Sequence, residues 1–150
     1  MALMLLLSAK AWSCSCSYIA SIEDTIADSP ILVEAQVMSL EETKSAEYGR
    51  LVHGATLRVT KRLKGLGGAQ TIIVGNVMCY ASLYPELMKV RHTYILPLFP
   101  LMNGHFQMPG CAHSGMELID GKLYTFEHTV GLQRRLKFYM MYSQFLVGYR

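Results

Sequence analysis

The sequence predicts a mainly β protein: one five-stranded barrel with a short helix near the N-terminus and a helix at the C-terminus. Three observations lead to this prediction. The chain has 150 residues, 51% hydrophobic and 17% charged, which fits one globular domain. Short runs rich in Val, Ile, Thr and Tyr alternate with turn-forming Gly, Pro and Asn. Apolar residues recur at helical spacing near the two ends of the chain.

The first half of the chain predicts a helix and two strands. Ser17 to Asp28 carries isoleucines at helical spacing, which indicates a short helix ended by the following Ser-Pro dipeptide. Ile31 to Leu40 is β-branched at first and then alternates, which predicts a strand. Glu41 to Gly54 is polar and indicates a loop or an extended hairpin connection. Thr56 to Leu63 alternates apolar with basic residues, as a half-buried strand does, and a glycine-rich flexible turn follows it.

Three further strands are predicted at β-rich runs, namely Thr71–Met78, Arg91–Leu96 and His105–Met108. Gly75 predicts a bulge in the first of them. Pro97 is expected to stop the second, because proline has no N–H to donate to a sheet. Residues 83–90 are expected to form a connection. The Asn-Gly dipeptide within Met102–Gly104 predicts the turn between the last two strands.

The pattern changes beyond Thr129. Apolar residues recur there at helical spacing, opposite basic residues, at Leu132, Leu136, Tyr139 or Met140, and Ser143. This predicts the C-terminal helix. Five short strands with a small helix at the N-terminal end and a helix at the C-terminal end describe a Greek-key barrel of the OB type.

Residues 1–13 are predicted to be a signal peptide. They carry a short apolar core, and small residues at Ala11 and Ser13 stand three and one positions before Cys14, as at a signal-peptidase site. No basic region precedes the core, as in a truncated leader. The alternative is a buried N-terminal strand or helix. If the leader is removed, the protein is secreted into an oxidising compartment and begins at Cys14 as one domain spanning residues 14–150.

Charge and hydropathy exclude some partners. The formal net charge is +3, and the basic residues are spread rather than massed, which does not favour nucleic acid. No apolar run approaches the ~18 residues of a membrane-spanning helix. Two small basic clusters indicate either a solvated face or a glycosaminoglycan or other anionic partner; they are Lys61, Arg62, Lys64 and Arg134, Arg135, Lys137.

The four cysteines predict two disulfides. They are Cys14, Cys16, Cys79 and Cys111. Of the three pairings, the one that joins Cys14 to Cys16 is disfavoured because so short a loop strains a disulfide, and the residues leave the other two open. The competing interpretation is a zinc site formed by these cysteines with His113 nearby, although structural zinc sites prefer paired C-x2-4-C spacing.

The sequence predicts no enzyme and no cofactor of its own. It contains no pairing of a nucleophile with a base and no paired carboxylates that would indicate catalysis. Four histidines are scattered and are interpreted as surface or hydrogen-bonded core residues rather than ligands: His92, His105, His113 and His128. The methionines, including Met140 and Met141, are interpreted as core filler.

Four segments of the sequence stand out: the N-terminal Cys14-Ser15-Cys16, the strand around LVEAQV, the run RLKG from Arg62 to Gly65, and Val77-Met78-Cys79. Together they resemble the tissue inhibitors of metalloproteinases. The wider family is the netrin-like module. The resemblance covers the N-terminal inhibitory domain of that family, from Cys14 to Phe145, and implies disulfides Cys14–Cys79 and Cys16–Cys111.

The chain also departs from the family. The family's third disulfide in this domain is absent, with Ile26 and Leu136 near the expected cysteine positions. Tyr18 replaces the proline that follows the C-x-C motif. No second cysteine-rich domain follows. These departures leave the netrin-like fold better supported than the inhibitory activity.

The resemblance implies that the free amine and carbonyl of Cys14 chelate the catalytic zinc of an extracellular metalloproteinase, where displacing a water stops hydrolysis. Ser15 would enter the specificity pocket of the protease, and the loop Glu41 to Gly54 would be a variable outer contact. The inhibitory residues are then Cys14, Ser15, Cys16, Ser17, Val77, Met78, Cys79 and Tyr80. For Ser15 the alternative role is a solvent-exposed spacer, and for Met78 and Tyr80 it is packing around a disulfide.

Two functions follow as expectations. The first is a secreted protein inhibitor of zinc metalloproteinases, with the metal belonging to the target. The second is a netrin-like extracellular module that binds matrix, a growth factor or heparin through its basic strands and final helix, without inhibiting a protease.

Overall fold

The computed structural model describes residues 16–46, 49–75, 83, 85–127 and 135–149. Within them, the helices are α1 (Ile22–Asp28) and α2 (Tyr142–Val147), with 3-10 turns η1 (Pro85–Leu87) and η2 (Met102–Gly104). The strands are β1 (Ile31–Ser45), β2 (Gly49–Lys64), β3 (Thr71–Gly75), β4 (Thr93–Pro100), β5 (His105–Gln107), β6 (Met116–Ile119), β7 (Lys122–Glu127) and β8 (Arg135–Met141).

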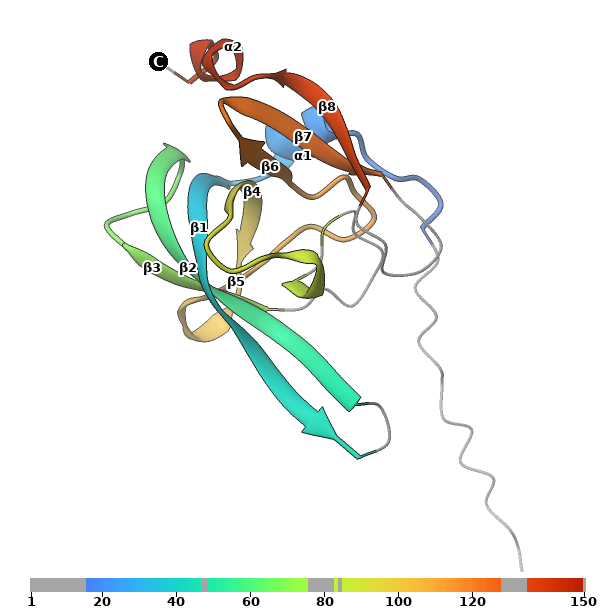
Figure 1. Cartoon of the computed structure of the whole chain (residues 1–150). Helices are drawn as coiled ribbons and strands as arrows, with labels where there is room; N and C mark the ends of the chain where they lie inside the picture. The colour runs from blue at the N-terminus through green and yellow to red at the C-terminus, as the bar shows by residue number, and fades with distance from the viewer. Residues whose placement is uncertain (1–15, 47–48, 76–82, 84, 128–134, 150) are drawn as a thin grey trace, which may run out of the picture.

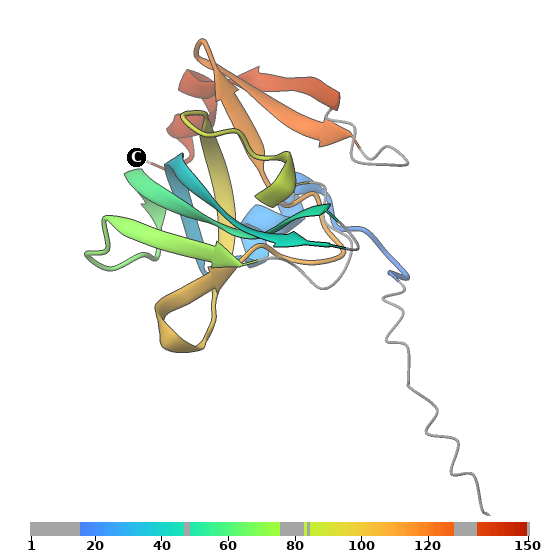
Figure 2. The same ribbon diagram turned by 60° about the horizontal axis from the view of Figure 1, so that its bottom comes forward.

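Five strands close into a barrel. They pair in the order β1-β2-β3-β5-β4, and a further pairing of β4 with β1 completes the circle. Every pairing is antiparallel except that of β3 with β5, which is parallel. Figure 1 and Figure 2 show the barrel from two directions, with α1 beside it. The predicted five-stranded barrel of the OB type with one helix toward each end is confirmed.

Alternating side chains fill the barrel. On β1, Val33, Ala35 and Val37 point inward and are fully buried. Leu57 on β2 and Leu96 on β4 are equally buried. This barrel core consists of Ile31, Val33, Ala35, Val37, Ala55, Leu57, Ile72, Val74, Leu83, Met88, Tyr94, Leu96, Leu98, Met108 and Phe126. The period-two pattern arises because successive residues of a strand face opposite sides of the sheet.

A second apolar cluster lies outside the barrel. Leu32 of β1 and Ile95 of β4 point away from the barrel core and are fully buried beneath α1. This second cluster consists of Ile22, Ile26, Leu32, Ile95, Met116, Leu123 and Phe145. Strands covered on both faces need apolar residues at consecutive positions, which explains the unbroken run at the start of β1.

Local sequence signals set the bounds of α1. The Ser21 hydroxyl caps the helix by accepting a hydrogen bond from the backbone N–H of Asp24 at 3.1 Å. The helix ends at Ser29, before Pro30. Where β2 ends, Gly65 has φ +75°, and a Cβ there would lie 2.0 Å from the Pro30 carbonyl oxygen. The chain can turn beside the end of α1 because this position is glycine.

Three strands extend the sheet beyond the barrel. β6 pairs with β4, and β7 and β8 follow in antiparallel order. No element was predicted from the sequence at the positions of β6 and β7. A signal was available, because Asp120 and Gly121 form a hairpin turn with φ +48° and +73°, and Asp-Gly between alternating apolar residues is a strong hairpin signature.

The predicted end of one strand at Pro97 is wrong. Pro97 does not stop its strand, since β4 continues to Pro100 and Pro97 pairs with Leu32. On its other edge β4 pairs with β6 up to Ile95 and with β5 from Phe99, so Pro97 lies in a gap where no partner needs its missing N–H. The described β2–β3 pairing keeps a continuous register up to Gly75, where the described part of the strand ends, so the bulge expected at Gly75 stays a prediction. Residues 76–78 of the predicted strand lie outside the described residues.

The C-terminal helix lies later than predicted. Residues 135–141 form the strand β8, and α2 begins at Tyr142. The register of β7 with β8 shifts between Leu123 and Tyr124, which pair with Met140 and Phe138. Tyr139 is therefore an extra residue in a bulge, and both Tyr139 and Met140 pack against the second cluster. Leu132 lies outside the described part of the chain.

Candidate functional site

The segment before α1 is fastened to the region after β5. Cys16 forms a disulfide with Cys111, with the Cα atoms 5.5 Å apart. Four residues later, the N–H of Ala20 donates to the carbonyl of Cys111 at 2.9 Å, and the N–H of His113 donates to the carbonyl of Ala20 at 3.0 Å. Ala20 and Ala112 thus form a parallel β-bridge. One disulfide and two backbone hydrogen bonds hold this short segment against the domain.

The structure describes two of the eight predicted inhibitory residues. Cys16 is half-buried in its disulfide, which is the pairing that the resemblance implies, and Ser17 is exposed. The others lie outside the described residues, as does the predicted Cys14–Cys79 bond: Cys14, Ser15, Val77, Met78, Cys79 and Tyr80. Tyr18 is 66% exposed and donates from its hydroxyl to Oδ2 of Asp24 at 3.2 Å.

A groove borders this anchored segment. It lies between α1, the residues after Cys111, and strands β7 and β8, and has a volume of about 540 Å³. Its lining includes Ile22, Glu23, His113, Phe126, Lys137 and Phe138. Phe138 is 52% exposed and packs edge-to-face on Tyr124. We call this groove the N-terminal groove. It was not predicted from the sequence because two of its walls are β7 and β8.

The predicted outer loop is a long β-hairpin. β1 and β2 pair from Leu32 with Lys64 to Ser45 with Gly49, so Glu41 to Gly54 is mostly strand. Figure 1 shows this hairpin extending beyond the barrel. Side chains bridge its two arms: Thr56 donates to Glu41 at 2.9 Å, and the Thr43 hydroxyl contacts the His53 ring. The hairpin presents an ordered rather than a loose outer surface.

The first basic cluster is engaged within the chain. Lys64 donates from its ammonium to the carbonyl of Ala27 at 2.9 Å and to that of Ile26 at 3.4 Å. Arg62 donates to the Ala69 carbonyl at 2.9 Å. Lys61 lies 5.6 Å from the ring centre of Tyr142. In the second cluster, Arg135 and Lys137 are exposed on β8, and Arg134 lies outside the described residues.

The zinc interpretation is wrong for two of its four cysteines. Cys16 and Cys111 are bonded to each other, so they offer no thiolate to a metal. Among the described residues, no group of three or more His, Cys, Asp and Glu side chains could hold a metal ion. His113 is half-buried in the N-terminal groove, and His105 is exposed.

The His92 ring pairs with a buried acid. Its Nδ1 lies 2.5 Å from Oε1 of Glu117, whose side chain is fully buried while that of His92 is 41% exposed. Glu117 is on β6, and His92 directly precedes β4. The carbonyl of His92 accepts a hydrogen bond from the N–H of Val37 on β1 at 3.0 Å, and the N–H of Arg91 donates to the carbonyl of Val37 at 2.8 Å. The pair fastens the turn before β4 to the extended sheet.

The two positions at which the resemblance would place a third disulfide are apolar and packed apart. Ile26 belongs to the second cluster, whereas Leu136 packs against the barrel core. Each side chain therefore contributes to a different apolar cluster. Burial of these side chains, at roughly 25 cal/mol per Å² of apolar surface, stabilises the fold there.

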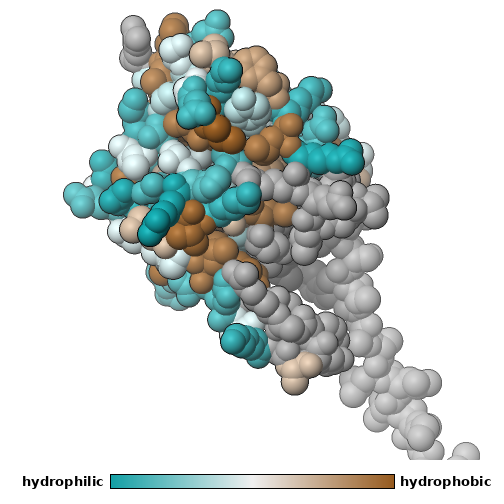
Figure 3. All heavy atoms as spheres, in the orientation of Figure 1, coloured by the Kyte–Doolittle hydropathy of each residue, from teal (hydrophilic) through white to brown (hydrophobic). Residues whose placement is uncertain are grey.

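On the face seen in Figure 3, hydrophilic side chains predominate and the hydrophobic ones gather into small groups. In the described residues, no helix is long and apolar enough to span a membrane. Searches of family models, of curated proteins and of solved structures found no match to this chain.

Proposed function

We propose that the protein is a secreted inhibitor of zinc metalloproteinases that acts through a mature N-terminus at Cys14. The observation that carries the proposal is the attachment of the segment two residues later, where Cys16 is bonded to Cys111 and Ala20 pairs with Ala112. A main-chain chelator needs this kind of support, because ordering a loose terminus on binding costs affinity. The disulfide also agrees with an oxidising, extracellular compartment.

The proposed chemistry uses main-chain atoms of Cys14. Its α-amino nitrogen and carbonyl oxygen would bind the zinc of the protease in place of the water that attacks the substrate. An α-amine has a reference pKa of about 7.7–8.0, so losing its proton costs little near neutral pH. Ser15 would point into the specificity pocket of the enzyme, and the segment Val77 to Tyr80 would lie beside it.

Two described surfaces could widen the contact with a protease. The exposed side chains of Ile19 and Phe138 lie on the anchored segment and on the edge of the N-terminal groove. The β1–β2 hairpin extends from the barrel as an outer arm. Aromatic and aliphatic side chains of this kind commonly anchor protein interfaces.

The test begins with the N-terminus of the secreted protein, determined by sequencing and intact mass. Material that begins at Cys14 is then titrated against a panel of zinc metalloproteinases. We expect stoichiometric inhibition of at least one enzyme and its loss when one alanine is added before Cys14, because an acylated nitrogen cannot chelate zinc. A protein with one alanine added after Arg150 is the matched control and should inhibit normally. A mature start at another residue, or full activity of every protease, would overturn the proposal.

A second candidate is a netrin-like module that binds sulfated glycosaminoglycan. The observation in its favour is the pair of exposed side chains Arg135 and Lys137, which have no carboxylate within 4 Å in the part of the chain described. This function predicts heparin binding that weakens with salt and is unaffected by an alanine before Cys14. Replacing both residues by serine should lower the salt needed for elution from heparin, whereas Lys122→Ser on β7 should not.

A further inference from the structure

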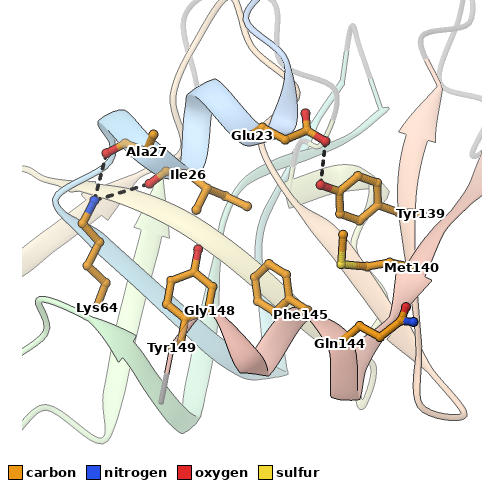
Figure 4. Close-up of a pocket in the computed structure, with 10 residues that line it drawn as sticks. All are labelled: Glu23, Ile26, Ala27, Lys64, Tyr139, Met140, Gln144, Phe145, Gly148 and Tyr149. Carbon is orange, nitrogen blue, oxygen red and sulfur yellow. Dashed lines mark hydrogen bonds between the residues drawn. The ribbon is translucent and has the colours of Figure 1, made fainter.

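A second cavity adjoins the N-terminal groove and shares Glu23 and Tyr139 with it. It is formed where α1, β8 and α2 meet and has a volume of about 480 Å³. Its apolar lining comes mainly from Ile26, Met140 and Phe145, which belong to the second cluster or pack against it. Figure 4 shows these side chains around the space below α1. The size and lining fit a small-molecule site, which is usually concave, apolar and equipped with few polar groups. We call this cavity the tyrosine pocket, after Tyr139 and Tyr149.

One edge of the tyrosine pocket carries a positive charge. The half-buried Lys64 reaches the pocket from β2, and its ammonium donates to the carbonyls of Ile26 and Ala27. An ammonium has three N–H donors, so these contacts leave one for a ligand. No carboxylate of the described residues lies within 4 Å of Lys64. The cation is therefore held in place by the end of α1, and its charge has no counter-ion there.

The same end of the pocket carries a phenol with an unused hydroxyl. Tyr149 packs its ring on Phe145, with the ring centres 5.0 Å apart. Figure 4 shows its hydroxyl pointing into the pocket toward α1. Burial raises the pKa of this phenol, so it stays a neutral O–H donor near neutral pH. The hydroxyl has no hydrogen-bond partner in the described part of the chain.

The opposite wall differs in chemistry. There Glu23 accepts a hydrogen bond from Tyr139 at 2.6 Å, so both groups are already engaged. Met140 and Phe145 lie between the two ends. The pocket thus has a cationic, donor-rich end, an apolar middle and an acidic end whose carboxylate is occupied by a tyrosine.

We propose that the tyrosine pocket binds an amphipathic monocarboxylate. Its carboxylate would accept hydrogen bonds from the Lys64 ammonium and the Tyr149 hydroxyl, and its apolar chain would lie over Phe145, Met140 and Ile26. A charge-assisted bond to Lys64 selects an anion, and the acid at the far end disfavours a second negative charge. This site is independent of the proposed zinc-chelating terminus.

The test is calorimetric titration of the full chain with decanoate, below its micelle concentration. We expect saturable binding of one equivalent and no comparable binding of decyltrimethylammonium, which has the same chain and the opposite charge. Lys64→Met keeps an apolar stem and removes the charge, and it should lower the affinity for decanoate at least about tenfold. Lys61→Met, three residues away on the same strand, is the matched control and should bind normally.

Tyr149→Phe provides a second test that leaves the packing of Phe145 in place. This substitution should lower the affinity for decanoate about three- to tenfold, because it removes one hydrogen-bond donor. Circular dichroism of each variant would verify its fold. Absence of saturable binding, equal affinity for the two surfactants, or unchanged affinity in both Lys64→Met and Tyr149→Phe would overturn the proposal.

Discussion

Tyr139 on β8 donates a hydrogen bond from its hydroxyl to Oε1 of Glu23 on α1, at 2.6 Å. The two residues are 116 positions apart in the sequence, and both line the N-terminal groove and the tyrosine pocket. This contact therefore forms the wall between the two cavities. It also ties the strand added beyond the barrel to the helix that follows the anchored N-terminal segment.

The Tyr139–Glu23 contact should make the fold sensitive to alkali. Burial, and then the Glu23 carboxylate, raise the pKa of Tyr139 above its ordinary value, and the hydrogen bond lowers the pKa of Glu23. A phenol of the unfolded chain ionises near pH 10, whereas the folded chain holds its proton longer. The stability that the Tyr139–Glu23 contact contributes is therefore complete below about pH 10 and is lost as the pH rises further. Urea unfolding at a series of pH values would measure this loss.

Tyr139→Phe should reduce that dependence. Near neutral pH the substitution should lower the free energy of unfolding by about 1 kcal/mol, the contribution of one hydrogen bond. Above pH 10 the variant should lose stability less steeply than the native protein. Burial also raises the pKa of Tyr142 and Tyr149, so a single substitution should diminish the alkaline loss without abolishing it. Equal alkaline slopes in both proteins would contradict this assignment.

The Cys16–Cys111 disulfide should contribute strongly to stability. The two cysteines are 95 residues apart, and closing so long a loop removes roughly 4 to 5 kcal/mol of chain entropy from the unfolded state. Replacing both by serine should lower the free energy of unfolding by an amount of this order, measured by urea denaturation. A change below about 1 kcal/mol would mean that the hydrogen bonds of Ala20 suffice to hold the segment.

The barrel could be predicted because its strands bury one face in a regular way. On β2, buried Ala55 and Leu57 alternate with exposed Arg58 and Thr60, so the period of two is visible in the letters alone. The extent of the β1–β2 hairpin could not be predicted from the sequence, because its outer arms lie beyond the core and carry polar residues that also suit a loop. Backbone pairing between the arms, rather than burial, makes those residues strands.

The strand β8 was mistaken for a helix for an identifiable reason. Leu136 packs inward, Phe138 points outward, and the bulge then turns both Tyr139 and Met140 inward. Inward residues at spacings of three and four are what an amphipathic helix produces, so the sequence pattern of this bulged strand matches that of a helix. The tyrosine pocket depends on this bulge and was missed with it.

The pair of His92 and Glu117 should hold the turn before β4. His92→Ala removes the imidazole that faces a fully buried carboxylate, and should lower the free energy of unfolding by about 2 to 3 kcal/mol. When Glu117→Gln has already removed the charge, the same His92 substitution should cost about 1 kcal/mol less. Thermal unfolding of the two single variants and the double variant gives this coupling; equal costs in both backgrounds would show that the pair is not an ion pair.

Gly65 should be among the positions least tolerant of substitution. Its φ of +75° is unfavourable for any residue with a side chain, and a Cβ would lie 2.0 Å from the Pro30 carbonyl oxygen, a backbone atom that cannot rotate away. Gly65→Ala should therefore lower the free energy of unfolding by at least about 2 kcal/mol, partly by pushing the end of α1 away from β2.

Gly67→Ala, in the same turn, is the matched control, because nothing lies within 4 Å of its Cβ position. The control should change stability by less than about 0.5 kcal/mol in the same urea titration. Equal effects of the two substitutions would mean that the turn moves freely, and that the close approach of Gly65 to Pro30 does not fix the junction between α1 and β2.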